Sequence, residues 1–318
     1  MDVQVPTATT SRRSYGLKHP LNPTDKLLIV FWGLLSAVSL GFHSRIQFWK
    51  EIVAANIIAA VLVWVLAYAS RTRPSKALRC LHDWAAFPLV LFTYKQPYYM
   101  IGPIHRGEDY DQLLMWLDHL LFQVNPTEWL AGFSNRYLTE VLQITYSLFY
   151  VLFLVVGFEL YRKDLPGFRY FRFTIVYGFL ISYAAYFFLP AAGPRFTLHD
   201  FSKMDTELPG LLFTPALRWF INVCESIPRG VSNSVAMACA QRDVFPSGHV
   251  MMTLVAIVLA HRHRLKVGSC TLVIGILLIF ATVYLRYHYL VDILAGALLA
   301  PVCLLTAKRV HTWFSDTR

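Results

Sequence analysis

Long apolar runs separated by short polar segments make up most of this chain. Several runs approach the roughly 20 residues that a helix needs to cross a bilayer. They do not alternate as the strands of a barrel do, and only helices or closed barrels satisfy the backbone in hydrocarbon. The pattern predicts an all-α, polytopic transmembrane bundle of about eight spans, over residues 27–42, 52–70, 85–101, 140–160, 170–190, 247–263, 268–287 and 289–307.

Two longer polar segments interrupt this series. The first, residues 102–137, contains a stretch from Asp111 to Phe122 in which apolar residues recur at helical spacing and the acids fall on another face. The stretch is predicted as an amphipathic helix at the membrane surface, either a lid over a lipid site or a simple interfacial anchor. The second segment, residues 191–246, is rich in Pro, Gly and Arg and is expected to fold over the outer end of the bundle.

Composition and charge support the membrane interpretation. Only 15% of the 318 residues are charged, against roughly 25% in soluble domains. The net charge of +10 invites a nucleic-acid partner, but Lys and Arg cluster in alternate segments, near residues 12–26, 71–79, 162–172, 262–266 and 308–318. This is the positive-inside pattern, which predicts both termini in the cytoplasm. We therefore expect a membrane protein that binds no nucleic acid.

Residues with catalytic chemistry lie at the ends of three predicted spans. These are Gly193-Pro194-Arg195 after the fifth span, Ser247-Gly248-His249 at the start of the sixth, and His288 with Asp292 between the last two. The predicted topology places all three on the outer side, although more than 90 positions separate the first from the last. Two imidazoles and a carboxylate are the groups needed to move a phosphoryl group through a covalent intermediate.

His288 and Asp292 are spaced i, i+4, which predicts contact on one helix face. The carboxylate can accept a proton from one ring nitrogen and leave the other free to attack a substrate. Metal binding is an alternative, but no H-E-x-x-H motif or cysteine set accompanies the pair. A structural pair that caps a buried helix end is the other alternative.

The stretch Pro246-Ser247-Gly248-His249 is typical of a helix start. Ser247 can cap the helix, Gly248 allows a close backbone approach, and the exposed N–H groups favour an anion. His249 could protonate a leaving-group oxygen, and the planar fork of Arg195 could neutralise a phosphate oxygen. The alternatives are an ordinary capped span and an arginine that snorkels to the interface.

Taken together, these motifs resemble the three-part signature of the type 2 phosphatidic acid phosphatase superfamily, and more closely its inositol phosphorylceramide synthase-like branch. The resemblance covers roughly residues 80–307 and includes His82-Asp83-Trp84, Leu117-Asp118-His119-Leu120, Pro126 with Trp129, and Pro190 to Arg195. It implies a six-helix catalytic domain within residues 80–318, preceded in residues 1–79 by a cytoplasmic tail and two accessory spans.

The resemblance also implies roles for the site residues. His288 would be the nucleophile that forms a phosphohistidine, Asp292 would orient it, and His249 would serve the leaving group and then the acceptor. The phosphate would be held by Gly193, Arg195, Ser247 and Gly248.

Two positions depart from the phosphatase pattern of the superfamily. Phe188 stands where that pattern has a lysine, and Thr282 where it has an arginine. A phosphomonoester carries about −1.5 to −2 charges near neutrality, whereas a diester carries one, so fewer cations suit a diester. Arg286 could substitute, but helical spacing would turn it away from His288, and we expect it to snorkel.

The sequence therefore predicts a membrane lipid phosphotransferase whose acyl-chain substrates enter sideways, with no metal or organic cofactor. A lipid phosphate phosphatase, with water as acceptor, is the nearest alternative, and a non-catalytic lipid transporter or scaffold is another. The expected location is a bacterial inner membrane, with the site facing the periplasm or lumen. Cys224 and Cys239 share an expected outer loop and could form a disulfide or be two unrelated cysteines.

Overall fold

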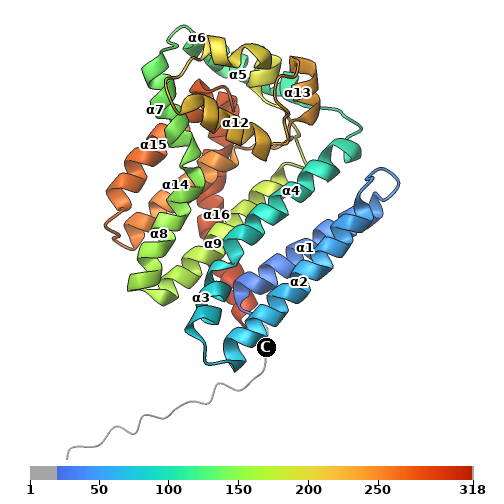
Figure 1. Ribbon diagram of the computed structural model, residues 1–318, viewed down its shortest axis with the longest axis vertical. Coiled ribbons are helices and arrows are strands. Elements are labelled where there is room, and N and C mark those ends of the chain that lie inside the picture. The colour runs from blue at the N-terminus through green and yellow to red at the C-terminus, as the bar shows by residue number, and fades with distance from the viewer. Residues whose placement is uncertain (1–19, 317–318) are drawn as a thin grey trace, which may run out of the picture.

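The computed structural model describes residues 20–316 (Figure 1). The basic residues Arg12, Arg13, Lys18 and Arg318 of the topology prediction lie outside this range. Between residues 20 and 316 every regular element is a helix and none is a strand. The predicted all-α class is confirmed.

Helices occupy all eight predicted spans. They are α1 (Pro23–Gly41), α2 (Trp49–Thr72), α4 (Ala86–Ile104), α7 (Arg136–Ser147) with α8 (Phe149–Lys163), α9 (Leu165–Ala185), α14 (Gly248–Arg262), α15 (Gly268–Tyr284) and α16 (Leu290–Asp316). Within the described chain, α1, α2 and α16 are each long and apolar enough to cross a membrane, and α7 with α8 would make a fourth span. Because α14 and α15 are shorter apolar helices, the structure is a membrane helical bundle with fewer full-length crossings than the eight predicted.

The span predicted over residues 140–160 is bent by 50° between α7 and α8. Side-chain hydroxyls beside the break compete for the backbone carbonyls, since Thr145 Oγ1 donates to the Val141 oxygen and Ser147 Oγ to the Gln143 oxygen, each at 2.8 Å. Such back-bonding bends helices. A hydropathy window cannot register this bend, because it averages over the break.

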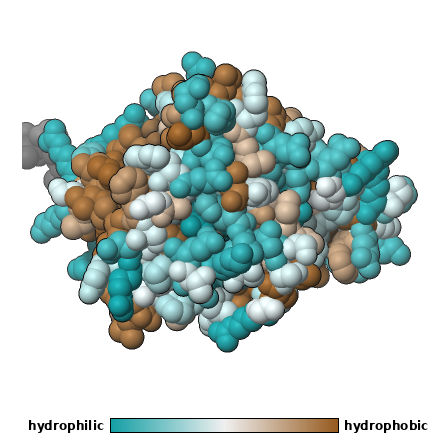
Figure 2. All heavy atoms as spheres, turned by 90° about the horizontal axis from the view of Figure 1, so that it is seen from above, coloured by the Kyte–Doolittle hydropathy of each residue, from teal (hydrophilic) through white to brown (hydrophobic). Residues whose placement is uncertain are grey.

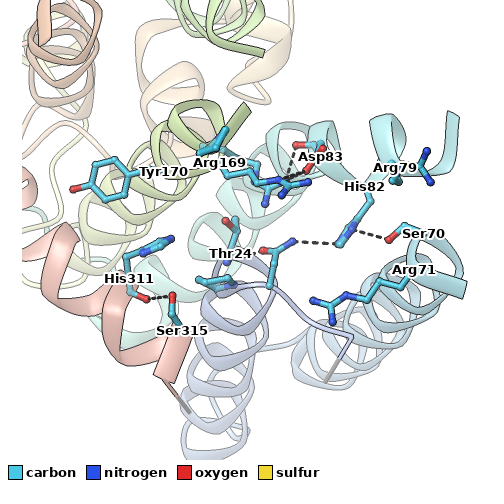
Figure 3. A pocket seen from close by; sticks show the side chains of 14 residues that line it. Thr24, Ser70, Arg71, Arg79, His82, Asp83, Arg169, Tyr170, His311 and Ser315 are labelled. Carbon is cyan, nitrogen blue, oxygen red and sulfur yellow. Dashed lines mark hydrogen bonds and ion pairs between the residues drawn. The ribbon is translucent and has the colours of Figure 1, made fainter. Parts of the chain in front are cut away.

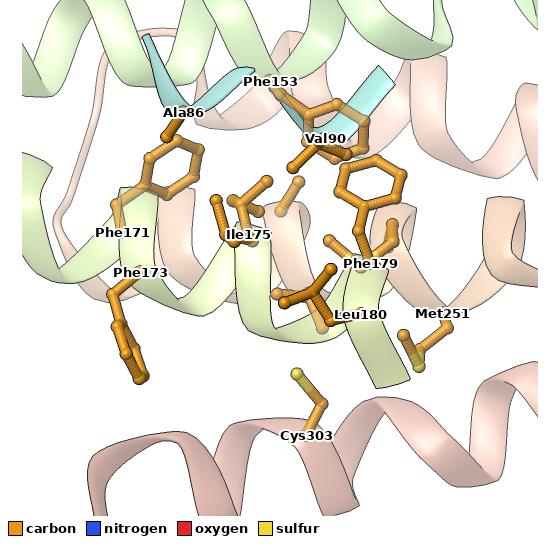
Figure 4. Close-up of a cluster of buried hydrophobic side chains, with 14 of the residues drawn as sticks. Ala86, Val90, Phe153, Phe171, Phe173, Ile175, Phe179, Leu180, Met251 and Cys303 are labelled. Atoms are coloured by element: carbon orange, nitrogen blue, oxygen red, sulfur yellow. The ribbon is translucent and has the colours of Figure 1, made fainter. Parts of the chain in front are cut away.

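Helix α9 forms the centre of the bundle and packs against α1, α4, α8, α14 and α16. Its side chains between Phe171 and Leu180 are nearly all buried, and they meet Phe153 of α8, Met251 of α14 and Cys303 of α16 (Figure 4). By contrast, the outward faces of α2 and α16 expose large apolar residues such as Leu62 and Leu305. A helical bundle surrounded by lipid needs a packed interior and apolar side chains on its outer surface.

Short helices cover one end of the bundle, at the top of Figure 1. They are α5 (Asp111–Phe122), α6 (Pro126–Ala131), α10 (Pro194–Thr197), α11 (Met204–Glu207), α12 (Thr214–Cys224) and α13 (Asn233–Cys239), with a 3₁₀ turn, η1, at Phe201–Lys203. We call this end the cap. Its face is largely hydrophilic across the middle (Figure 2). Cys224 and Cys239 both lie in it as free thiols, so the disulfide alternative is wrong for this structure.

Candidate active site

Two histidines far apart in the sequence meet below the cap. His288 lies in the loop between α15 and α16, where its N–H donates to the Thr282 oxygen at 3.0 Å. His249 is the second residue of α14. Their closest ring nitrogens, His288 Nε2 and His249 Nδ1, are 3.3 Å apart. One phosphorus atom could therefore contact both imidazoles.

Asp292 lies on the other side of His288. Its Oδ2 is 3.4 Å from His288 Nδ1 and accepts the backbone N–H of Tyr289 at 2.9 Å. The carboxylate is fully buried and His288 is 4% exposed. Among residues 20–316, His288 Nδ1 and Asp292 Oδ1 have no hydrogen-bond partner, so the pair is close but not aligned. Catalytic hydrogen bonds often tighten only when substrate is bound.

The predicted shared helix face for this pair is wrong. Helix α16 begins at Leu290, so His288 precedes it and Asp292 stands in its first turn. The contact is made instead across the turn that starts the helix. Spacing of i, i+4 brings residues together in a helix, but here the carboxylate also caps the turn.

The start of α14 adopts the predicted capped form. Ser247 is buried, and its Oγ accepts the N–H of Val250 at 3.3 Å. A Cβ on Gly248 would lie 2.4 Å from the hydroxyl oxygen of Tyr186. Gly248 is therefore needed for the close approach of α14 to the end of α9.

Arg195, in α10, is only 5% exposed, so it does not snorkel. Its guanidinium forms an ion pair with Glu225 and lies 3.5 Å from the amide oxygen of Asn222. Its Cζ atom is 4.9 Å from the ring centre of Tyr287, the neighbour of His288. This arrangement puts a buried cation close to the two histidines.

Stacked rings complete the connection between Arg195 and His249. The ring of Tyr287 stacks on Tyr146 with centres 4.3 Å apart, and Tyr146 stacks on His249 at 4.8 Å. Both tyrosines are buried. Sequence reasoning missed them, because a tyrosine in a chain with 23 Phe and 17 Tyr carries no signal of its own.

Asp111, in α5, holds the first motif in place. Its two carboxylate oxygens accept the N–H groups of Ala192 at 2.8 Å and Gly193 at 2.7 Å, and Oδ1 also accepts the Tyr289 hydroxyl at 2.8 Å. Gly193 has a φ of +106°, which favours glycine. A carboxylate of the cap thereby fixes the backbone before Arg195 and the residue after His288.

Asp118, one heptad later on α5, plays a parallel part. It accepts the N–H groups of Leu290 at 2.9 Å and Val291 at 2.7 Å, and so caps α16. Both acids of α5 are buried. Its exposed residues are Gln112, His119 and four large apolar side chains, Leu113, Trp116, Leu120 and Leu121. The helix thus turns its acids towards the protein and functions as a support for the site. The signal that could have revealed this is two acids seven residues apart on a helix whose other residues are mainly apolar.

The two departures from the phosphatase pattern place no cation in the site. Phe188 is 75% exposed, and Thr282 is buried with its hydroxyl donating to the Ile279 oxygen at 2.6 Å. Arg286 is not the snorkelling residue that we predicted, since it is 2% exposed and forms an ion pair with Glu207. Helix α15 ends at Tyr284, and Arg286 has a φ of +66°. Arg286 is therefore not part of a helix, and the helical spacing that predicted its orientation relative to His288 does not apply.

Burial sets the protonation of groups near the site. It lowers the pKa of His288, in the loop outside both helices, well below its ordinary value. His249 and Arg195 act in the same direction, and a hydrogen bond with the Val244 backbone opposes them. Burial also raises the pKa of Asp243, in the loop before α14, where the Tyr94 hydroxyl donates to it. At neutral pH the His288 ring is therefore neutral, with a lone pair on one ring nitrogen.

An apolar groove of about 530 Å³ opens beside the site. Its walls come from α5, α6, α15 and α16 and include Phe122, Trp129, Ile279 and Leu290. Leu290 is two residues from His288. A metal site was one alternative for the His288–Asp292 pair. Residues 20–316 hold no group of three or more His, Cys, Asp or Glu that could bind a metal ion.

Comparison with known proteins gives one family. The model of the PAP2 superfamily matches residues 112–306, a range that contains every site residue from Gly193 to Asp292. Neither a curated protein nor a solved structure matches the chain. Since the family match covers more than half of the chain, the chain belongs to the PAP2 superfamily and is an enzyme of the phosphatase or phosphotransferase type.

Proposed function

We propose that this protein is a lipid phosphotransferase of the inositol phosphorylceramide synthase-like type. It moves a phosphodiester headgroup from one membrane lipid to the hydroxyl group of another. The observation that carries the proposal is the 3.3 Å contact between His288 and His249, with Asp292 buried behind His288. Together they supply a nucleophile, an acid–base group and an orienting carboxylate.

The geometry supports a double displacement. His288 Nδ1 faces Asp292, which leaves Nε2 to attack phosphorus. As the N–P bond forms, the bond from phosphorus to the donor lipid's oxygen breaks, and His249 gives that oxygen a proton. The acceptor hydroxyl then attacks the phosphohistidine and loses its proton to His249, and the N–P bond breaks. Arg195 balances the phosphate charge, and Gly193, Ser247 and Gly248 present backbone around it.

The small number of unpaired cations near His288 favours a phosphodiester as the substrate. Arg195 is already paired with Glu225, and Arg286 with Glu207. Phe188 and Thr282 add no positive charge. A site with so little uncompensated charge suits the single negative charge of a diester better than a monoester of about −1.5 to −2.

The apolar groove supports a substrate with long chains. It lies beside Leu290 and has walls of apolar side chains from four helices. An alkyl chain lying there would leave its headgroup near His288, so the lipid enters sideways. The acceptor is likewise a lipid alcohol.

The proposal includes a location and a domain division. Residues 80–318 form the catalytic domain, and residues 1–79 supply a cytoplasmic tail and two accessory spans. The basic segments near Arg71, Arg162 and Arg262 face the cytoplasm by the positive-inside rule. The catalytic site then faces the periplasm of a bacterial inner membrane.

The test uses the purified full chain with two kinds of donor. Phosphatidylinositol with ceramide should yield an inositol phosphorylceramide and release diacylglycerol. With a diacylglycerol of different acyl chains as acceptor, it should yield phosphatidylinositol that carries those chains, and both products should disappear in His288→Ala. Phosphatidic acid supplied alone is the control for hydrolysis. Free phosphate from the monoester with no lipid product would identify a phosphatase and overturn the transferase proposal. Acid-labile, base-stable label retained on the protein would report the phosphohistidine.

A further inference from the structure

A second polar pocket lies at the end of the bundle away from the cap. Its volume is about 450 Å³, and its walls come from α1, α2, α3 (Lys76–Trp84), α9 and α16 (Figure 3). We call it the basal pocket. It lies against residues such as Arg71, Arg79, Arg169 and Arg172.

Two helices connect the basal pocket with the candidate active site. Arg169 and Arg172 stand in the first turns of α9, whereas Tyr186, just after its end, meets Gly248. Asp292 is in the first turn of α16, whereas His311 near its end lines the basal pocket. The 21 residues of α9 span about 30 Å. The basal pocket is therefore separate from the catalytic site.

Positive charge dominates the lining. Among the described residues that line the pocket, four are arginines and one, Asp83, is an acid. Asp83 Oδ1 is 3.0 Å from Arg172 Nη1 and 3.5 Å from Arg169 Nε, so two guanidinium groups share it. Asp25, just outside the lining, is engaged with His82 at 2.9 Å. Arg79, Arg169 and Arg172 alone outnumber the single carboxylate of the lining, so the pocket carries a surplus of positive charge.

Arg172 is a buried cation in the wall of the basal pocket. It is 2% exposed, and its Nη1 donates to the Asp83 backbone oxygen at 2.9 Å and to the Asp83 carboxylate at 3.0 Å. Its Nε has no hydrogen-bond partner among residues 20–316. Asp83 therefore holds the Arg172 guanidinium in place at the wall of the pocket.

The pocket is built by a motif that the catalytic function did not use. His82 Nε2 contacts Asp25 of α1, and its Nδ1 lies 3.1 Å from Ser70 Oγ of α2. The next residue, Asp83, joins α3 to α9 through Arg172. The motif thus fastens the accessory helices to the bundle. Arg71 and Arg79 come from outside the range that matches the family model.

We propose that the basal pocket binds a phosphate-bearing anion. Guanidinium forks recognise phosphate oxygens in pairs, and basic pockets between membrane helices hold anionic headgroups. The ligand is either the headgroup of an anionic bilayer lipid or a free phosphorylated small molecule. The binding is distinct from turnover at His288.

The experiment measures binding to the full-length protein after delipidation in detergent. The probes are dioleoylphosphatidylglycerol, dioleoylphosphatidylcholine and glycerol 3-phosphate, with native mass spectrometry as the readout. The pocket variant is Arg79→Gln with Arg169→Gln. The matched control is Arg262→Gln with Arg309→Gln, which removes the same charge from exposed residues that do not line the pocket. Both proteins keep the catalytic site intact.

We expect phosphatidylglycerol to bind the pocket variant at least tenfold more weakly than wild type, and the control to be unchanged. Glycerol 3-phosphate that binds wild type in the same way identifies a free phosphate ligand, whereas binding of the lipid alone identifies a headgroup site. Equal affinities in the two variants, or equal binding of phosphatidylcholine and phosphatidylglycerol, would overturn the proposal. Because the readout is binding, a failure here is distinguishable from a failure of the transferase proposal.

A second measurement, made on the wild type, tests the proposal even if the pocket variant does not fold. Hydrogen exchange in wild type should slow over residues 70–83 and 165–172 when phosphatidylglycerol is added. Unchanged exchange in both segments would also refute the site.

Discussion

The backbone N–H of Ser247 donates to the carbonyl oxygen of Asp292 at 3.1 Å. This bond joins the start of α14 directly to the first turn of α16. A Cβ on Gly296 would lie 2.4 Å from the carbonyl oxygen of Ser247, so the two helices approach more closely than any other residue at position 296 would allow. This backbone contact fixes the spacing of His249, in α14, and His288, in the loop just before α16.

Two glycine substitutions should separate a backbone clash from a side-chain clash. Both Gly248→Ala and Gly296→Ala should lower stability by about 1–3 kcal/mol, as overpacking does. Adding Tyr186→Phe should restore much of the loss in Gly248→Ala, because the clash is with the Tyr186 hydroxyl. It should not rescue Gly296→Ala, whose clash is with the Ser247 backbone. Thermal unfolding in detergent measures both, and equal rescue of the two would contradict this packing.

Replacing Asp292 with Asn should impair turnover far more than substrate binding. The amide can still accept the Tyr289 N–H, but it no longer carries the charge that favours the nucleophilic form of His288. We expect a fall in kcat of about 10³- to 10⁴-fold, by analogy with other His–Asp couples, and little change in KM. Steady-state kinetics with a lipid donor test this. An unchanged kcat would remove Asp292 from the mechanism.

Asp111→Asn tests the support that α5 gives to the site. Asp111 accepts hydrogen bonds from two backbone N–H groups and from the Tyr289 hydroxyl. Bonds to a charged acceptor contribute about 1.5–3 kcal/mol each. We expect kcat to fall by about 10- to 100-fold and KM to rise, since the Gly193 backbone loosens.

Tyr289→Phe is the matched control for that substitution. It removes one donor and leaves both backbone bonds of Asp111 in place. Its effect on kcat and KM should be much smaller. If the two variants lost activity equally, the hydroxyl rather than the backbone support would be the important group.

The cap should lose stability in mild acid because of His199. Burial, followed by the charge of Arg286, lowers the pKa of His199 to about 4. Its Nε2 lies 3.2 Å from Thr127 Oγ1. The unfolded chain takes up this proton near the ordinary value of about 6.5, whereas the folded chain resists it. The stabilising effect is therefore complete above pH 6.5 and is lost as the pH falls towards about 4.

The substitution that checks this is His199→Asn. The wild-type melting temperature should fall across that window, and the variant should show a shallower fall. A wild-type melting temperature that rises on acidification would contradict the assigned direction.

Hydropathy and motif spacing predicted much of this structure. The apolar runs located eight helical stretches, and three short motifs located residues that prove to lie around His249 and His288. Both signals are local, because a span is a continuous run and each motif lies within a few residues.

The remainder depends on contacts between distant residues. The ion pair of Arg286 with Glu207 and the bonds from Asp118 to α16 join segments 79 or more positions apart. A single sequence does not show which distant residue forms an ion pair or hydrogen bond with a buried charged group. Arg286 was therefore predicted to snorkel to the interface, and the helix at residues 111–122 was predicted to be either a lid or an interfacial anchor.

The apolar groove beside Leu290 has a consequence for how the rate of this protein depends on substrate. A lipid that reaches His288 from within the bilayer is encountered in two dimensions, so its mole fraction in the membrane determines occupancy. Adding inert detergent or carrier lipid at a fixed bulk amount of donor should then slow the reaction. Kinetic constants for such an enzyme are meaningful when expressed per unit of membrane surface.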